Sequence, residues 1–138
     1  MPDRFNLGTH QRQVTTTSAD AQRWFDLGLN WCFGFNHEEG VACFKRALDQ
    51  DPDCAMAHWG VAYAAGPNYN MPWWRRDDQG RETALATAYD ATQKALATMD
   101  GCTEAEQALI RALPARYPQR TPIEEMQSWD HDFADAMR

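Results

Sequence analysis

A fixed spacing of large and small residues between positions 21 and 52 constrains the fold of this chain more than any other feature. The residues that carry it are, in chain order, Trp24, Leu27, Gly28, Trp31, Gly40, Phe44, Ala47 and Pro52. Side chains three and four positions apart share one face of an α-helix. The spacing therefore predicts two helices that approach closely at Gly28, with Phe44 returning from the second helix into the gap. Such a pair cannot bury its apolar face alone and has to stack on a neighbour.

Helical periodicity continues along the chain and predicts an all-α fold of about six helices. Capping residues, glycines and prolines mark their ends. The first predicted helix covers 19–33 and follows Ser18, and the second runs from Asn36 to about Gln50 with Glu39 as capping partner. A third helix is capped by Asp53, and a fourth has apolar positions from Leu85 to Met99. The fifth runs from Ala105 to about Tyr117 with a capping box of Thr103 and Glu106, and the sixth is opened by Thr121, Pro122 and Glu124. Pro114 is expected to kink or shorten the end of the fifth helix.

A long insertion interrupts this pattern between Gly66 and Gly80. It contains two prolines and two glycines, which argue against a helix across it. It also carries aromatic and asparagine side chains, and it is far longer than an ordinary helix–helix connection. We therefore expect a contact surface here, which would include Asn68, Tyr69, Asn70, Trp73 and Trp74.

The pattern W-x2-L-G-x2-aromatic, then a small residue, F and P, resembles the tetratricopeptide repeat of 34 residues. The resemblance implies a right-handed α-solenoid of antiparallel helix pairs. The pairs would be repeat 1 at 18–52, repeat 2 at 53–101 with the insertion 66–80, and a divergent pair at 103–138, all in one domain, 18–138, after an extended arm, 1–17.

The amino-acid sequence from His10 through Trp73 also resembles the N-terminal region of longer bacterial tetratricopeptide proteins. The segments that carry this likeness are 15–18, 34–39, 51–57 and 66–70. The last predicted helix reaches Arg138 with its apolar stripe intact and no residue that ends it. Because a solenoid needs a polar terminal unit, we expect the chain to continue in a longer array, or a partner or second copy to cover its end.

The tetratricopeptide resemblance further implies a concave groove lined by the first helix of each repeat. Its positions fall here on apolar and aromatic residues, chiefly Phe25, Leu29, Cys32, Phe33, Met56, Trp59 and Tyr63. The family's carboxylate clamp uses Lys and Asn where this chain has Phe25, Leu29, Trp59 and Tyr63, so clamp chemistry is not expected. The groove is predicted to bind an apolar peptide, with Trp59 and Tyr63 as anchors.

Composition excludes several classes of partner. Thirteen basic and twenty acidic side chains give a net charge of -7, which disfavours nucleic acid and anionic membranes. No apolar run reaches the length of a membrane span, and residues 1–17 lack the pattern of an export signal. Cys32, Cys43, Cys54 and Cys102 lie among small apolar positions, which favours buried, reduced thiols and a cytoplasmic protein.

Candidate metal and catalytic groups have simpler structural interpretations. His37 with Glu38 and Glu39, and His58 with Cys54, lack the closely paired ligands of a zinc site. Glu38 with Glu39, and Asp77 with Asp78, are placed as capping acids in first turns of helices. No nucleophile elbow, phosphate loop or dinucleotide motif occurs. We therefore expect no metal, no cofactor and no catalytic residue.

Three interpretations of function remain open. The leading one is a non-enzymatic scaffold that binds a protein or peptide, which could be the rest of its own longer chain, in the aromatic groove roofed by residues 68–74. The second is a small-ligand or metal site at the insertion, built from His37, His58, Asn68, Tyr69 and Asn70. The third is an architectural solenoid end whose groove is filled by its own helices.

Overall fold

The computed structural model describes residues 13–34, 36–67, 71–122 and 126–137, and every regular element within them is helical. The elements are α1 (Ala19–Phe33), α2 (His37–Gln50), α3 (Ala55–Ala65), η2 (Trp73–Arg75), α4 (Asp78–Thr98), η3 (Met99–Gly101), α5 (Glu104–Arg116) and α6 (Gln127–Ala136). The expectation of an all-α fold with about six helices is confirmed. No helix in these ranges combines the length and apolar character needed to cross a lipid bilayer.

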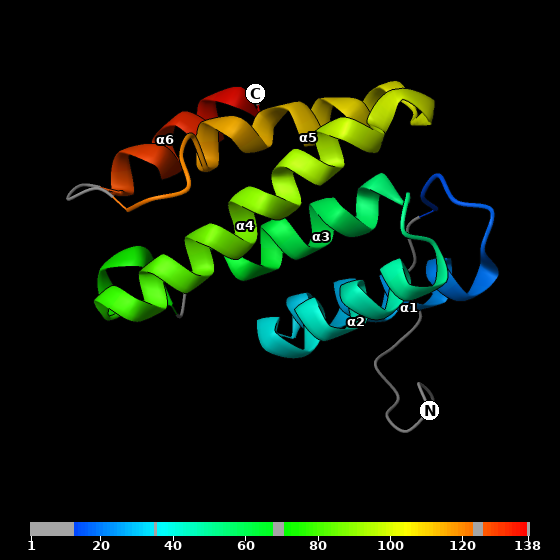
Figure 1. Ribbon diagram of the computed structural model, residues 1–138, viewed down its shortest axis with the longest axis horizontal. Coiled ribbons are helices and arrows are strands. Elements are labelled where there is room, and N and C mark those ends of the chain that lie inside the picture. Colours follow the sequence, from blue (N-terminus) through cyan, green and yellow to red (C-terminus); the bar gives the residue numbers. More distant parts are fainter. Residues whose placement is uncertain (1–12, 35, 68–70, 123–125, 138) are drawn as a thin grey trace.

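The helices follow one another in space as they do in sequence (Figure 1). α1 packs on α2, α2 on α3, α3 on α4, and α5 on α6. In the view of Figure 1 the pair α1 and α2 lies at the bottom, α3 and α4 in the middle, and α5 and α6 at the top. α3 also contacts α1 and α5, so it is the central helix, and nearly all of its residues are buried.

Local capping explains where three of the helices begin. Ser18 accepts a hydrogen bond from the backbone N–H of Ala21 at the start of α1, and Asn36 accepts one from Glu39 at the start of α2. Thr103 and Glu106 form the complete capping box of α5. These three predicted starts are confirmed, because side-chain oxygens satisfy N–H groups that a helix start leaves without partners.

Three predicted boundaries differ from the structure. α3 is capped by Cys54 without a side-chain hydrogen bond, rather than by Asp53. α4 begins at Asp78, inside the predicted insertion 66–80, because the carboxylate of Asp77 accepts the N–H of Gly80. The predicted placement of Asp77 and Asp78 as capping acids at a helix start is confirmed. α6 begins at Gln127, whereas the hydroxyl of Thr121 accepts a hydrogen bond from the side chain of Gln119; Glu124 lies outside the described residues.

Pro114 lies inside α5, which nevertheless continues to Arg116. The sixth helix turns much of its apolar stripe inward: Met126, just before it, and Trp129 are buried in the core. Phe133 is partly buried against that core, and Met137 is exposed. The apolar stripe of the sixth helix, which was expected to need a partner or further chain to cover it, is therefore largely packed against the rest of this chain.

The ring of Phe44 is held between two glycines on different helices. A Cβ atom built on Gly28 in α1 would lie 2.7 Å from the Phe44 ring, and one built on Gly60 in α3 would lie 2.6 Å from it. Phe25 packs on the same ring, with centroids 5.4 Å apart. The predicted close approach at Gly28 is present, and Gly60, which the sequence analysis did not single out, makes a second one.

The other residues of the spacing pattern divide between core and surface. Gly40 and Ala47 are buried with Phe44, and a Cβ atom on Gly40 would lie 2.7 Å from Cys32 Sγ. Half-buried positions are Trp24, Leu27 and Trp31, and Pro52 is exposed. Arg46 lies over the Trp24 ring at 4.9 Å and so covers its outer face.

The described part of the N-terminal arm is fastened to two distant helices. Val14 is buried in the core. The carboxylate of Glu106 in α5 accepts hydrogen bonds from the backbone and hydroxyl of Thr15, at 2.9 and 2.5 Å, as well as from the N–H of Thr103. The hydroxyl of Thr16 donates to Asp51 after α2. Burial by itself raises the pKa of Glu106, but the hydrogen bonds from Thr15 and Thr103 lower it overall.

We expect the contribution of Glu106 to depend on pH. Folding lowers the pKa of Glu106, so its carboxylate stabilises the folded state fully at pH values above the pKa of a glutamate in the unfolded chain, about 4.3. This stabilisation is lost as the pH falls through the lower pKa of Glu106 in the folded protein. Replacing Glu106 by Gln removes charged hydrogen bonds and should lower the free energy of unfolding at pH 7 by about 2 kcal/mol. Urea denaturation at pH 7 and pH 3 measures both effects, and the difference between wild type and Glu106→Gln should shrink at pH 3. An equal difference at both pH values would contradict the role of the charge.

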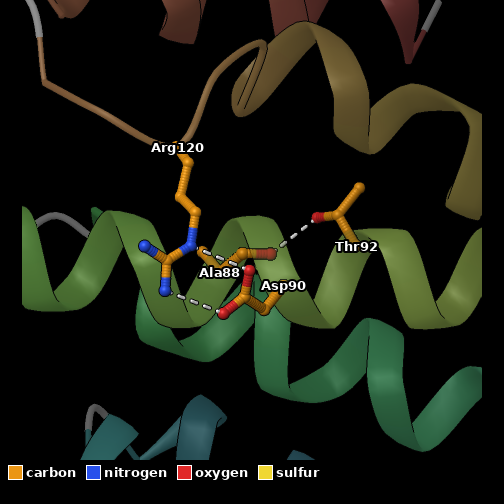
Figure 2. A network of polar contacts seen from close by, with 4 residues as sticks. All are labelled: Ala88, Asp90, Thr92 and Arg120. Atoms are coloured by element: carbon orange, nitrogen blue, oxygen red, sulfur yellow. Dashed lines mark hydrogen bonds and ion pairs between the residues drawn. The ribbon is translucent and has the colours of Figure 1, made fainter.

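A surface ion pair fixes the connection between α5 and α6 to α4 (Figure 2). Arg120 donates from Nε and one terminal nitrogen to the two carboxylate oxygens of Asp90, at 3.0 and 3.2 Å. The hydrogen bond from Arg120 lowers the pKa of Asp90. In the same helix the buried Thr92 hydroxyl donates to the carbonyl of Ala88. Both side chains of the ion pair are exposed, so solvent screens the pair and it contributes little to stability.

Candidate functional site

An apolar hollow of about 360 Å³ opens between α1, α3 and the end of α6. We call it the apolar hollow. Its lining residues are Leu29, Cys32, Phe33, His37, Met56, Trp59, Tyr63, Leu109 and Met137. α1 and α3 supply most of them, because residues at helical spacing on these two helices face the same side. The volume lies in the range in which proteins bind small molecules or single large side chains.

Aromatic rings form the wall of the apolar hollow along α3. Trp59 and Tyr63, one helical turn apart, stack with ring centroids 5.1 Å apart and an angle of 14° between the planes. Trp59 is buried, but Tyr63 is 39% exposed. Phe33, at the end of α1, is 60% exposed. Large apolar side chains that are this accessible around one concavity are typical of a binding surface.

The structure brings together many of the groove residues that the sequence predicted. Leu29, Cys32, Trp59 and Tyr63 all line the apolar hollow. Phe25 does not: it is fully buried and packs against Phe44 in the core. Its side chain therefore offers no surface to a partner.

The aromatics of the insertion lie elsewhere. Trp73 is buried and meets the ring of Tyr117 edge-on, with centroids 6.4 Å apart, so it packs on α5 and does not line the apolar hollow. Trp74 is 65% exposed and is also absent from the lining. The predicted contacts of Asn68, Tyr69 and Asn70 lie outside the described residues.

Three residues of the apolar hollow were not predicted to line the groove: His37, which was considered only for a small-ligand or metal site, and two residues from later in the chain. Leu109 belongs to α5 and Met137 follows α6. Both reach the hollow because α5 packs against α3 and α6 packs against α5. No signal local to the fifth or sixth helix relates it to the groove.

Side chains from later in the chain satisfy the carbonyls at the C-terminal end of α3. Arg116 donates to the carbonyls of Tyr63 and Pro67, Arg76 donates to Gly66, and the hydroxyl of Tyr117 donates to Ala62 at 2.7 Å. Two cations at the negative end of a helix dipole are stabilising. This arrangement fixes the end of α3 that carries Tyr63.

Arg116 is also surrounded by aromatic rings. Its guanidinium carbon lies 5.1 Å from the ring centroid of Tyr63, 5.3 Å from that of Tyr117 and 5.1 Å from that of Phe133. Burial raises the pKa of Tyr117 to about 12, so its hydroxyl stays protonated and keeps donating to Ala62. Burial also lowers the pKa of Arg76, and the positive charge of Arg116 lowers it further.

The metal-ligand candidates do not come together. The Nε2 atom of His58 lies 2.9 Å from the carbonyl of Pro52, which occupies that nitrogen, and burial lowers the pKa of His58. His37 lines the apolar hollow instead. No group of three or more His, Cys, Asp or Glu side chains in the described ranges is arranged to hold a metal ion.

The four cysteines are free thiols. Burial raises the pKa of Cys32 and of Cys54 to about 11. Burial likewise raises the pKa of Cys43 and Cys102. Because the thiolate is the reactive form, these four side chains are poor nucleophiles near neutral pH.

Comparison with protein-family models, with curated proteins and with solved structures finds no match to this chain.

Proposed function

We propose that this chain is a non-enzymatic, tetratricopeptide-like module that binds a segment of another protein in the apolar hollow. The observation that carries the proposal is the hollow itself, which is lined almost entirely by apolar and aromatic side chains, several of them exposed at its rim. An amphipathic or extended segment that places one large apolar side chain there would bury Phe33 and Tyr63. Burial of a few aromatic anchors supplies most of the affinity in such interfaces.

The packing of the helices supports the repeat part of the proposal. Successive helices contact one another, and α1 with α2 and α3 with α4 have the most extensive contacts. The Gly28 and Phe44 contact is the kind of close packing that the tetratricopeptide spacing demands. In this interpretation the three pairs form a right-handed solenoid, and the apolar hollow lies on its concave face.

An architectural role is the second candidate, and one observation favours it. Leu109 and Met137 come from the last two helices and already form part of the lining of the apolar hollow. If side chains of the same protein filled the hollow completely, no partner could bind there. The domain would then serve only as the terminal unit of a helical scaffold. The exposure of Phe33 and Tyr63 favours binding over this alternative.

Peptides selected from a displayed random library test the proposal. We expect the wild-type chain to select sequences that share one large apolar residue, because the apolar hollow accommodates one such side chain. Phe33→Ala and Tyr63→Ala should each weaken the binding of a selected peptide about tenfold or more. Fluorescence polarisation with a labelled peptide measures the dissociation constants.

Trp74→Ala provides the matched control, since Trp74 is an exposed aromatic outside the apolar hollow. It should leave peptide affinity unchanged. Circular dichroism melting of every variant separates lost binding from lost folding. Selected peptides that bind wild type, Phe33→Ala and Tyr63→Ala equally well would show that the binding surface lies elsewhere.

A further inference from the structure

A second hollow, of about 250 Å³, shares Tyr63 with the apolar hollow but has both a cationic and an anionic side chain in its lining. We call it the charged hollow. It is lined by Tyr63, Pro67, Pro72, Arg116, Asp130 and Phe133. Aromatic and proline side chains make up most of its wall, with one cation and one carboxylate among them.

Arg116 supplies the cation, and its side chain is almost fully buried. It is only 6% exposed, and it is held there by the carbonyls of Tyr63 and Pro67 and by the three surrounding rings. A guanidinium has five N–H donors, and these two bonds use only two of them. The side chain is therefore fixed in place and still has donors for a ligand.

Asp130 supplies the carboxylate from α6. Burial raises its pKa, and the nearby charges of Arg116 and His131 oppose this increase. Within the described residues, Arg116 and Asp130 do not form an ion pair with each other. A cation and a carboxylate thus line one hollow without neutralising each other directly, although buried charges gain most from a direct partner.

We propose that the charged hollow binds a free α-amino acid with an apolar or aromatic side chain. The carboxylate of the ligand would pair with Arg116, its ammonium group with Asp130, and its side chain would pack on Phe133 and the two prolines. A simple anion would be repelled by Asp130 and a simple cation by Arg116, whereas a zwitterion complements both. The volume suits a ligand of the size of one amino acid.

This inference does not rest on the proposed peptide binding. The two hollows share Tyr63 but no other lining residue. Variants confined to one hollow therefore test one proposal without the other.

Isothermal titration calorimetry of the full chain with L-phenylalanine tests the inference. We expect saturable binding with a stoichiometry of one. N-acetyl-L-phenylalanine lacks the ammonium charge and L-phenylalaninamide lacks the carboxylate, so each should bind at least about tenfold more weakly, since a buried charge would lose its partner. L-leucine should bind, and L-lysine should bind more weakly because its second charge meets an apolar wall.

Asp130→Asn should weaken the binding of L-phenylalanine about tenfold or more, whereas Asp132→Asn should not change it. Asp132 is the matched control because it is an exposed aspartate on the same helix and outside the lining. Phe33→Ala, which alters only the apolar hollow, should leave this binding unchanged. Absence of measurable binding, equal binding of the N-acetyl derivative, or full affinity in Asp130→Asn would each overturn the inference, as would loss of binding in Phe33→Ala.

Discussion

Replacing Gly28 by Leu should unfold the first helix pair and lower the free energy of unfolding by about 3 kcal/mol or more. A Cβ atom at this position already lies 2.7 Å from the Phe44 ring, and leucine would add three further carbons. The ring has little room to move, because Gly60 of α3 also lies close to it: a Cβ atom built on Gly60 would be 2.6 Å from the Phe44 ring. Inserting atoms into a packed core forces side chains off their rotamers and shifts the backbone. Thermal denaturation followed by circular dichroism at 222 nm measures the loss.

Gly101→Ala is the control for this variant. No atom lies within 4 Å of a Cβ placed there, so its melting temperature should stay close to that of wild type. The double variant Gly28→Ala with Phe44→Leu should be more stable than Gly28→Ala alone, because the smaller side chain makes room. If Gly28→Leu melted at the wild-type temperature, the close approach of helices at Gly28 would not be needed for the stability of this fold.

Replacing Arg116 by Met should also destabilise the protein, by about 3 kcal/mol. Methionine keeps much of the packing volume, but the carbonyls of Tyr63 and Pro67 would lose their donor. Unsatisfied buried carbonyls are costly, and the end of α3 would also lose a cation that stabilises its dipole. Chemical denaturation gives the change in free energy of unfolding. Hydrogen exchange should show faster opening at the C-terminal turn of α3 than elsewhere.

Arg111→Met is the matched control on the same helix. Arg111 is exposed and donates to Gln107 one turn earlier, an interaction worth a few tenths of a kcal/mol. Its replacement should have little effect on stability. If Arg111→Met and Arg116→Met destabilised the chain equally, the carbonyl contacts at α3 would not be the reason.

Local rules explain most of what the sequence predicted correctly. Ser18, Asn36 and Thr103 cap their helices through atoms only a few positions away, so the sequence itself contains both partners. The insertion was predicted to extend to Gly80 because that glycine was interpreted as a break, although Asp77 and Asp78 were correctly predicted as capping acids at a helix start. The nearby carboxylate of Asp77 instead uses the Gly80 N–H to begin the helix.

Long-range packing explains what the sequence analysis missed. Leu29, Cys32, Trp59 and Tyr63 were predicted to share a groove from the resemblance to tetratricopeptide repeats, and they do line one hollow. The role of Arg116 was not predicted, since its acceptors Tyr63 and Pro67 lie 53 and 49 positions earlier. Nothing local to residues 104–116 distinguishes this arginine from Arg111.

The hydrogen bonds between Thr15 and the Glu106 carboxylate join residues that are 91 positions apart in the sequence. On a ribosome, which releases the chain from its N-terminus, this arm emerges long before the helix that receives it. Thr15 therefore lacks the carboxylate that accepts its hydrogen bonds until α5 has left the exit tunnel. Final closure of the molecule is a late event in its synthesis, and a pause in translation before position 106 would prolong the interval in which a chaperone can engage the nascent protein.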